Sequence, residues 1–281
     1  MKTAIKLILI YLGIQLVCGG LIGIPFTIIA RMNGGSVDAT RVSELTLAPS
    51  MLLSMAVMFF YLWKAHYIPK DKTSWSFISF PFLIITFLIG LSMTVLMDML
   101  TAVLSWVPDI LEQQFDALQS GWLGIVAITL LGPILEELLF RGGATKALLE
   151  RYSPRKAIFL SALLFGVFHL NPAQIVAAFF GGLLLAWVYY RTRSLIPCIL
   201  IHIVNNSISV MLSLTYPDAD TIRDVTGTTP YYLLIAVAAM VFVGCFLRIK
   251  HHDFPIRQKN SIPRPAPRRA RRPLCRRRRF E

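Results

Sequence analysis

The sequence predicts an all-α, polytopic membrane protein with about eight transmembrane helices and a disordered basic C-terminal tail. Of its 281 residues, 56% are hydrophobic and only 15% are charged, and the mean hydropathy is +0.63. This composition is more apolar and less charged than that of an average soluble domain. Several apolar runs reach the ~20 residues that a helix needs to span a bilayer. The runs are long and continuous, whereas the strands of a membrane barrel alternate in short pieces.

Eight apolar segments are predicted to form membrane helices, at residues 7–30, 47–66, 77–98, 120–140, 157–170, 173–190, 195–214 and 231–248. The fifth is short, and only Asn171 and Pro172 separate it from the sixth, so we expect it to be tilted or sunk into the bundle. The first segment stays apolar as far as Ala30, which favours an uncleaved helix over a signal peptide. The segment 99–118 mixes apolar side chains with acids and is predicted to lie at the outer interface.

Charges in the short loops predict that both termini lie in the cytoplasm. Lys and Arg follow the second, fourth, sixth and eighth segments, whereas acids dominate the loops after the third and seventh. Cytoplasmic loops carry the excess of Lys and Arg, which sets this orientation. The sequence carries no organelle signal, which favours a bacterial-type plasma membrane. A bacterial source would disfavour prenylated substrates.

The chain divides into four predicted parts: membrane helices with an outer amphipathic segment at 1–118, a catalytic helical core at 119–214, an outer loop and the last helix at 215–250, and a tail at 251–281. From Arg248 onward the chain holds 13 of its 28 Lys and Arg but only two acids. Such a segment cannot build a core and is predicted to be disordered and to bind anionic lipids. Only Phe254 and Phe280 could stack on bases there, so no specific nucleic acid is expected. The four cysteines show no paired spacing, so no disulfide framework is predicted.

Two adjacent carboxylates, Glu136 and Glu137, lie near the end of the fourth apolar segment. A charged side chain inside a membrane costs roughly 2.5–3.5 kcal/mol to insert, so it is a candidate functional residue. On a helix, Glu137 and Arg141 are one turn apart and can form an ion pair. Glu136 points about 100° away. We therefore expect one carboxylate held by arginine and one free for chemistry; the alternative is that both merely mark the membrane–water boundary.

Two histidines lie inside apolar segments on separate helices. His169 shares a helix face with Phe165, and His202 shares one with Asn206, because the members of each pair are four residues apart. A lone intramembrane histidine is usually a packing residue bonded to a neighbouring helix. Two of them, with an amide and a glutamate pair, are expected to converge on one cavity, because each polar group in lipid needs a partner. We expect that cavity to open to cytoplasmic water.

Helix rise gives an estimate of depth. Glu136 lies about 8 Å inside Arg141, and His202 lies about 10 Å inside Leu195, so these two depths agree. His169 lies about 20 Å from Lys156 by the same count. This mismatch leaves open whether His169 reaches the cavity.

The chemistry that such a set can perform is the activation of water. A glutamate can take the proton from water as it attacks a carbonyl, with a histidine assisting. Asn206 and a histidine N–H can donate to the developing oxyanion. A zinc ion bound by Glu136, His169 and His202 would serve a similar purpose, although the spacing differs from HExxH, and the sequence leaves a divalent metal open. No serine lies in a G-x-S-x-G context and no cysteine is paired with a histidine motif, so no covalent nucleophile is expected.

Three ordered motifs, Glu136-Glu137-x-x-x-Arg141, Phe165-x-x-x-His169 and His202-x-x-x-Asn206, resemble those of the CPBP family. That family contains the CAAX prenyl endopeptidases and the bacterial Abi proteins that process bacteriocins or give self-immunity. The resemblance covers about residues 120–210. It implies an eight-helix intramembrane endopeptidase whose site faces the cytosol.

The resemblance also implies roles for the motif residues. Glu136 would activate water with His169, while His202 and Asn206 would hold the oxyanion. Glu137 and Arg141, with Phe165, would be supporting residues. Both a metalloprotease mechanism and a metal-independent glutamate mechanism are argued for the family.

The sequence thus predicts a hydrolase that cleaves a peptide bond in a membrane-associated or lipidated peptide or protein. The main alternative is a non-catalytic membrane scaffold or immunity protein that binds a bacteriocin or another partner. A transporter that uses Glu136 and the histidines as a proton relay is a further alternative. It is disfavoured because the chain shows no paired inverted halves with broken helices.

Overall fold

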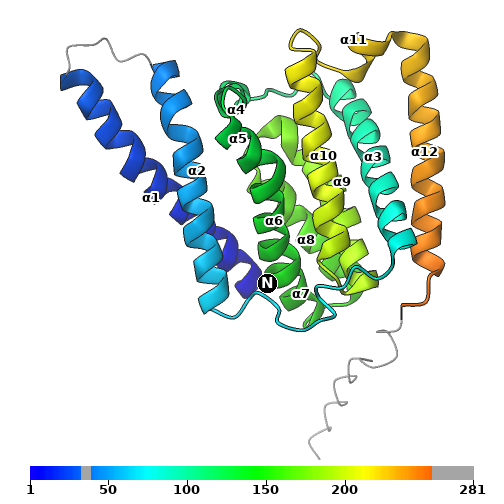
Figure 1. Cartoon of the computed structure of the whole chain (residues 1–281). Helices are drawn as coiled ribbons and strands as arrows, with labels where there is room; N and C mark the ends of the chain where they lie inside the picture. The colour runs from blue at the N-terminus through cyan, green and yellow to red at the C-terminus, as the bar shows by residue number, and fades with distance from the viewer. Residues whose placement is uncertain (33–38, 255–281) are drawn as a thin grey trace, which may run out of the picture.

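A computed structural model describes residues 1–32 and 39–254, and every regular element in those two ranges is helical (Figure 1). The long helices are α1 (Lys2–Met32), α2 (Ala39–Lys64), α3 (Phe80–Val103), α9 (Pro172–Thr192), α10 (Ile196–Thr215) and α12 (Thr228–His251). The shorter ones are α4 (Glu112–Gln119), α5 (Trp122–Val126), α6 (Gly132–Glu137), α7 (Lys146–Leu149), α8 (Pro154–Phe168) and α11 (Ile222–Thr226). Two π-helical stretches, η1 (Ala127–Leu131) and η2 (Leu138–Thr145), join α5, α6 and α7 into one continuous helix.

Within the described ranges, seven helices are long and apolar enough to cross a membrane, and they include the continuous helix Trp122–Leu149. The predicted all-α membrane fold is thereby confirmed. Helix α8 has 15 residues and rises about 22 Å, less than the ~30 Å of a hydrocarbon core. It is short, as the sequence predicts, yet it still runs from one end of the bundle toward the other (Figure 1).

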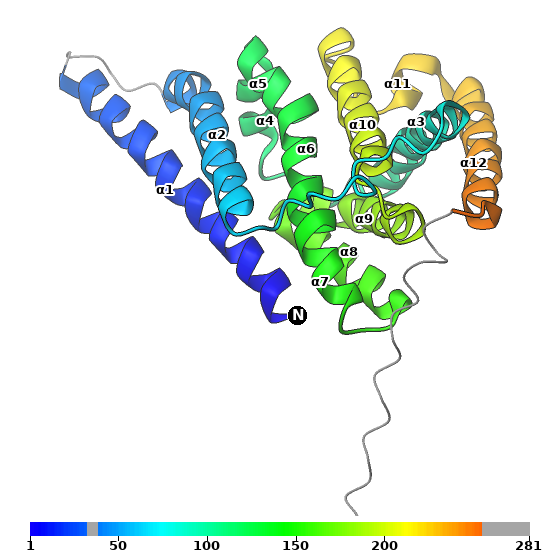
Figure 2. The same ribbon diagram turned by 60° about the horizontal axis from the view of Figure 1, so that its bottom comes forward.

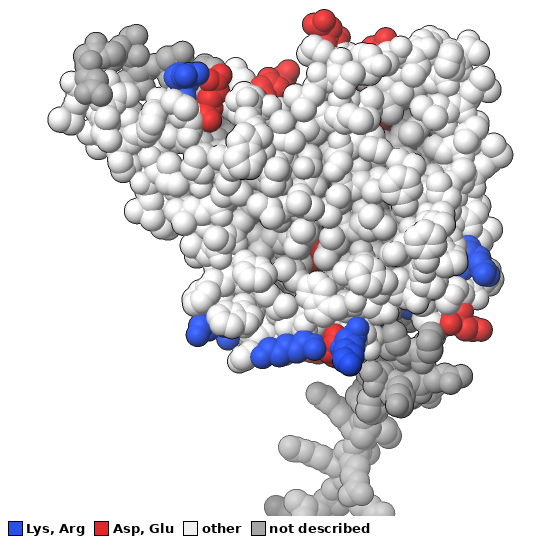
Figure 3. Space-filling view, in the orientation of Figure 1, with Lys and Arg blue, Asp and Glu red and all other residues white. Residues whose placement is uncertain are grey.

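The start of α1 and the end of α12 lie at the same end of the bundle (Figure 1). Lys and Arg gather at this end, whereas Asp and Glu predominate at the opposite end (Figure 3). We call these the basic end and the acidic end. The loop 65–79 lies across the basic end, beneath η2 and the start of α10 (Figure 2). Ser74 O accepts a hydrogen bond from Leu195 N at 2.8 Å, and Ser76 O accepts one from Ser194 Oγ at 2.7 Å. These bonds fix the loop to α10.

The segment 99–118 is not one amphipathic element. Its first residues are the last turns of α3, and its final residues lie in α4, at the acidic end. The hydrophobic run of α3 continues past Asp98, because Met99, Leu100, Ala102 and Val103 extend it.

The predicted disordered tail, 251–281, lies outside the described residues from position 255 onward. Its first residues are packed against the bundle. The rings of Phe254 and Phe82 are 5.3 Å apart, and Arg191 Nη2 donates to the carbonyls of Lys250 at 2.6 Å and His252 at 3.0 Å. The end of α12 is thus tied to α9.

Helices α8 and α9 form a closely packed hairpin around a sharp turn. Leu170 has a φ of 55°, and Pro172 begins α9. Asn171 is fully buried; its Nδ2 donates to Asp109 Oδ1 at 2.8 Å and its Oδ1 accepts from Ile110 N at 3.2 Å. The turn that follows His169 is therefore anchored to the segment after α3.

Close approach of α8 and α9 requires a glycine at position 182. A Cβ there would lie 3.1 Å from both Ala162 Cα and Phe165 Cδ1, whereas a Cβ at Gly181 would meet only Met93, at 3.9 Å. The two glycines are adjacent in the sequence, but only Gly182 is in tight contact with α8.

We predict that Gly182→Ala lowers the free energy of unfolding by about 1–3 kcal/mol, because the added methyl group overpacks the contact with α8. The matched control Gly181→Ala should leave stability unchanged or slightly higher, because alanine favours the helix. Thermal unfolding in detergent measures both. Equal midpoints for the two variants would contradict the prediction.

Candidate active site

The continuous helix 122–149 carries the glutamate pair at its centre and is irregular on both sides of it. In η1 the Gly132 N–H bonds to Ala127 O, five residues back. In that π register the next acceptor, Ile128 O, would be paired with Pro133, which has no N–H. Asn206 Nδ2 on α10 donates to Ile128 O instead, at 2.9 Å. The irregular backbone thus binds α10 to the helix that carries the glutamates.

Glu137 lies at the centre of a buried charge cluster. Its side chain and that of Arg141 are both fully buried, and Arg141 Nη1 donates to Glu137 Oε1 at 2.8 Å. His202 Nδ1 lies 2.9 Å from the same oxygen. This confirms the predicted ion pair one helix turn apart. A buried charge must be paired and hydrogen-bonded to be tolerated, so Glu137 is held in place as a carboxylate acceptor.

Arg141 has two further contacts that hold it inside the protein. Its Nη2 donates to Gly182 O at 3.4 Å, and its guanidinium lies over the Phe165 ring, 4.6 Å from the centroid. A desolvated cation–π contact of this kind stabilises the charge. Arg141 therefore links the glutamate helix to α8 and α9.

Glu136 lies on a different side of the helix and faces a cavity. Its side chain is 20% exposed, and its Oε2 lies 3.8 Å from His202 Nε2. That distance is too long for a hydrogen bond, and this oxygen has no hydrogen-bond partner among the described residues. One carboxylate is thus neutralised by arginine while its neighbour is left facing the cavity.

His202 lies between the two glutamates. Because the carboxylate of Glu137 accepts hydrogen bonds, the Nδ1 of His202 carries the hydrogen of the 2.9 Å contact. The Nε2 atom then faces Glu136. A second group that fixes the tautomer and ring orientation of a histidine is common at functional sites.

His169 also lines the cavity. Its Nδ1 lies 2.8 Å from Phe165 O; a carbonyl can only accept, so Nδ1 carries the hydrogen and Nε2 is left as an acceptor. The Phe165 ring contacts both histidines, with centroids 4.9 Å from His169 and 5.8 Å from His202. Counting helix rise from the basic end places His169 deeper in the membrane than Glu136 and His202. That count does not apply to helices that are tilted and begin at different heights, and His169 reaches the cavity.

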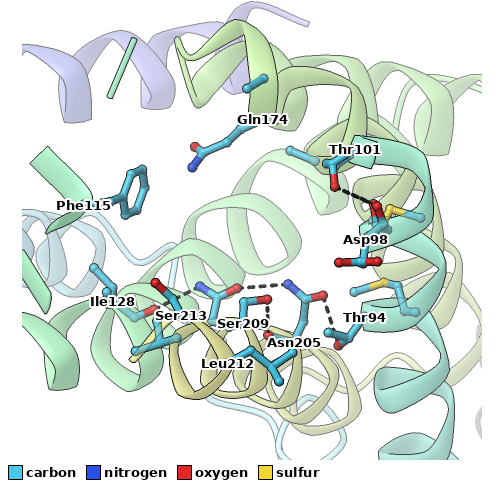
Figure 4. Close-up of a pocket in the computed structure, with 18 of the residues that line it drawn as sticks. Thr94, Asp98, Thr101, Phe115, Ile128, Gln174, Asn205, Ser209, Leu212 and Ser213 are labelled. Carbon is cyan, nitrogen blue, oxygen red and sulfur yellow. Dashed lines mark hydrogen bonds between the residues drawn. The ribbon is translucent and has the colours of Figure 1, made fainter. Parts of the chain in front are cut away.

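Asn206 lines the same cavity and belongs to a short chain of side-chain hydrogen bonds, drawn as dashed lines beside Asn205 in Figure 4. Its Oδ1 accepts from Asn205 Nδ2 at 3.3 Å, and Asn205 Oδ1 accepts from Thr94 Oγ1 at 3.3 Å. The bond to Ile128 uses one of the two Asn206 N–H groups, so the other is available to a ligand. The structure therefore places all four predicted site residues, Glu136, His169, His202 and Asn206, around one cavity.

The cavity has a volume of about 580 Å³, within the range of small-molecule and peptide sites. It extends from Glu136 to Ser213, Tyr216 and Asp220, which are exposed at the acidic end. That the cavity opens to cytoplasmic water stays a prediction.

The candidate metal set does not fit a metal ion in this arrangement. Among the described residues, no group of three or more His, Cys, Asp or Glu side chains is placed to hold one. We therefore derive no step through Glu136, His169 and His202 as metal ligands.

Several lining residues were not singled out from the sequence. Asn205 directly precedes Asn206 of the third motif, so the sequence could have indicated it as a candidate site residue. Asp98, near the end of α3, lines the cavity and accepts hydrogen bonds from Ile222 N and Tyr231 Oη, both at 2.9 Å. Gln174 also lines the wall (Figure 4). Asp98 lies far from the motifs in sequence, whereas Gln174 follows His169 by five residues, and no local pattern marks either of them.

Residues 118–208 match the family model described as Type II CAAX prenyl endopeptidase Rce1-like. This range contains all three motifs. The central region of the chain is thus similar to this family of endopeptidases. The chain is also similar to a curated protein of Bacillus subtilis (strain 168) named "Putative membrane peptidase YdiL": the two are 30% identical over 99 residues, which are 35% of this chain and 41% of that protein. The match thus spans less than half of the relative. No solved structure matches the chain.

We predict that Arg141→Met lowers the free energy of unfolding by about 3–5 kcal/mol, because it leaves the Glu137 carboxylate buried without its cation. The double variant Glu137→Gln with Arg141→Met should recover most of this loss, because no buried charge then remains in the pair. Thermal unfolding in detergent compares the variants. An Arg141→Met protein as stable as wild type would show that the pair does not hold the site together.

Proposed function

We propose that the protein is an intramembrane endopeptidase that hydrolyses a peptide bond in a membrane-associated or lipidated peptide or protein. The observation that carries this proposal is that two adjacent carboxylates have different surroundings: Glu137 is neutralised by Arg141, whereas Glu136 faces the cavity. A carboxylate without a cation, beside two histidines and an amide, is suited to activating water. The match of this region to a CAAX prenyl endopeptidase family model supports the same class of reaction.

The reaction needs one water molecule, and no covalent bond forms between the enzyme and the substrate. Glu136 takes a proton from the water as its oxygen attacks the scissile carbonyl carbon. His169, with Nε2 as an acceptor, holds the second hydrogen of that water. When the tetrahedral intermediate collapses, the C–N bond breaks and Glu136 returns its proton to the leaving nitrogen. The products are a carboxylic acid, which keeps the second hydrogen of the water, and an amine, and the carboxylate of Glu136 is regenerated.

The negative charge on the carbonyl oxygen needs donors that are already in position. Asn206 supplies the N–H that it does not use for Ile128. His202 supplies Nε2–H when it is protonated, while its Nδ1 remains bonded to Glu137. Both donors belong to α10, which the bond to Ile128 O fixes against the glutamate helix.

We further propose that the basic end of the bundle lies in the cytoplasm of a bacterial-type plasma membrane. The support is the excess of Lys and Arg at that end (Figure 3), which marks the cytoplasmic side of membrane proteins. Both termini would then be cytoplasmic. The predicted contact between the basic tail and anionic lipids concerns residues outside the described ranges and remains a prediction.

We predict that Glu136→Ala abolishes the formation of specific peptide termini in cells, because the carboxylate that takes the proton from the attacking water is then missing. Quantitative analysis of peptide termini, in cells with matched expression of wild type and variant, makes the comparison and names the substrate. Glu112→Ala is the matched control, because this exposed acid does not line the cavity. Identical profiles with a folded, inserted Glu136→Ala protein would contradict proteolysis and support the binding or immunity alternative.

We predict that Asn206→Ala lowers kcat by about 10²- to 10³-fold, as expected when one oxyanion donor is removed. KM should change little, because the interaction forms mainly in the transition state. Cleavage of the substrate found above, by purified protein in proteoliposomes, gives both constants. Ser209→Ala is the control, since this hydroxyl lines the cavity but bonds to Asn205 O of its own helix. Equal effects of the two variants would remove Asn206 from the mechanism.

A further inference from the structure

A chain of side-chain hydrogen bonds runs from the glutamate helix across α10 to α3 (Figure 4). Asn206 Nδ2 donates to Ile128 O at 2.9 Å, and Asn206 Oδ1 accepts from Asn205 Nδ2 at 3.3 Å. On the other side of Asn205, its Oδ1 accepts from Thr94 Oγ1 at 3.3 Å. The chain thus joins one motif residue, Asn206, to two residues of the cavity lining that belong to none of the three motifs.

The donors and acceptors of this chain fit in one direction. Ile128 O is a carbonyl and can only accept, so the Asn206 amide must turn its Nδ2 toward it. Asn206 Oδ1 then faces Asn205 and needs a donor, which Asn205 Nδ2 supplies. Asn205 Oδ1 in turn faces Thr94, whose hydroxyl can donate. The carbonyl that Pro133 leaves free therefore sets the orientation of both amides.

Close packing of α3 against α10 brings Thr94 to Asn205. A Cβ at Gly90 would lie 3.3 Å from Val204 Cβ and 3.4 Å from Ile201 Cα, so the two helices approach closely there. Thr94 is one turn further along α3 and is only 5% exposed. Its hydroxyl also lies 3.1 Å from Gly90 O, so its one hydrogen is shared between that carbonyl and Asn205, as in a three-centre bond. Thr94 is thus a fixed anchor for the end of the chain.

The Asn206 amide is held at both of its polar atoms. The terminal torsion of an asparagine side chain has a broad energy profile, so a single hydrogen bond restrains the amide plane weakly. Bonds from Nδ2 to Ile128 and to Oδ1 from Asn205 together fix that plane. The second N–H of Asn206, which Ile128 does not use, then has one direction. A donor that is already oriented stabilises a developing oxyanion without reorganisation.

We propose that Asn205 is a positioning residue, which orients the Asn206 amide toward the oxyanion, and that Thr94 holds Asn205 in place. The proposal rests on the proposed function, in which Asn206 donates to the oxyanion. It adds a residue of α3, outside the range 118–208 that matches the family model, to the groups on which the reaction depends. Asn205 and Thr94 act through the next hydrogen bond of the chain.

The first experiment measures kcat and KM in proteoliposomes, with the peptide identified by the Glu136→Ala comparison as substrate. Asn205→Ala should lower kcat by about 10- to 10²-fold with little change in KM, because a displaced catalytic group costs about this much. Thr94→Val should lower kcat by about 3- to 10-fold, as expected for the loss of one hydrogen bond. Thr94→Ser, which keeps the hydroxyl, should restore it.

The matched control for Thr94→Val is Thr86→Val. Thr86 is also buried on α3, and its hydroxyl donates to Phe82 O of its own helix at 2.8 Å, so its loss should leave kcat at the wild-type value. Equal losses of kcat in the two valine variants, or a Thr94→Ser protein as slow as Thr94→Val, would overturn the role of Thr94.

The second experiment separates positioning from a general structural role. Because Asn205 acts through Asn206, Asn205→Ala should cause no further loss of kcat in an Asn206→Ala background, whereas independent effects would multiply. The same fold-loss in both backgrounds would overturn the proposal.

The third experiment needs no catalysis. The chain has five asparagines, so protein labelled with ¹⁵N only at asparagine gives few side-chain amide signals in NMR spectra, and Asn206→Ala assigns the pair of Asn206. Asn205→Ala should shift or broaden that pair, because the amide plane is then released. The pair of Asn171, which is buried and bonded to Asp109, should stay unchanged.

This measurement keeps the two claims distinguishable. Unchanged Asn206 signals in Asn205→Ala would overturn the positioning role. Shifted Asn206 signals, with no cleavage of any peptide by wild type, would instead count against the proposed proteolysis and support the orientation of Asn206 by Asn205.

Discussion

The buried contact between Glu137 and Arg141 is the constraint on which the site depends. Both side chains are fully buried, so neither charge can exist there without the other. The pair ties the glutamate helix to α8 and α9 through Gly182 O and Phe165, and to α10 through His202. With Glu137 held in this way, its neighbour Glu136 is left without a cation in the cavity. Identical side chains at adjacent positions thus have different surroundings, because the helix period points them about 100° apart.

The helix that carries the pair is shaped by its sequence. Pro133 cannot donate a hydrogen bond, which leaves Ile128 O to Asn206, and π-helical turns lie on both sides of the glutamates. Such turns are frequent at functional sites. The hairpin of α8 and α9 brings His169 to the same cavity, and its close packing requires Gly182. The positions of the side chains in the site therefore depend on backbone features outside it, namely the π-helical turns and the close packing of α8 against α9.

Much of this arrangement follows from the sequence, and some does not. The all-helical fold, the short α8 and the Glu137–Arg141 pair follow from apolar run lengths and from the i,i+4 rule. The extent of the cavity toward the acidic end does not, because side chains of α4 and α11 line it there. Asp98 shows the same limit: at the level of sequence it is one acid near a helix end, and only the contacts with Ile222 and Tyr231 place it in the wall.

The most direct measurement of the central claim compares Glu136→Gln with Glu137→Gln for both stability and cleavage. Each change replaces a carboxylate by an amide of nearly the same shape, so only charge and proton affinity differ. We expect Glu136→Gln to unfold at the wild-type temperature yet release no specific peptide termini, and Glu137→Gln to lose stability, because Arg141 then lacks its counter-ion. If Glu136→Gln cleaves normally, or if the two variants lose stability equally, the assignment of one glutamate to structure and the other to water is contradicted.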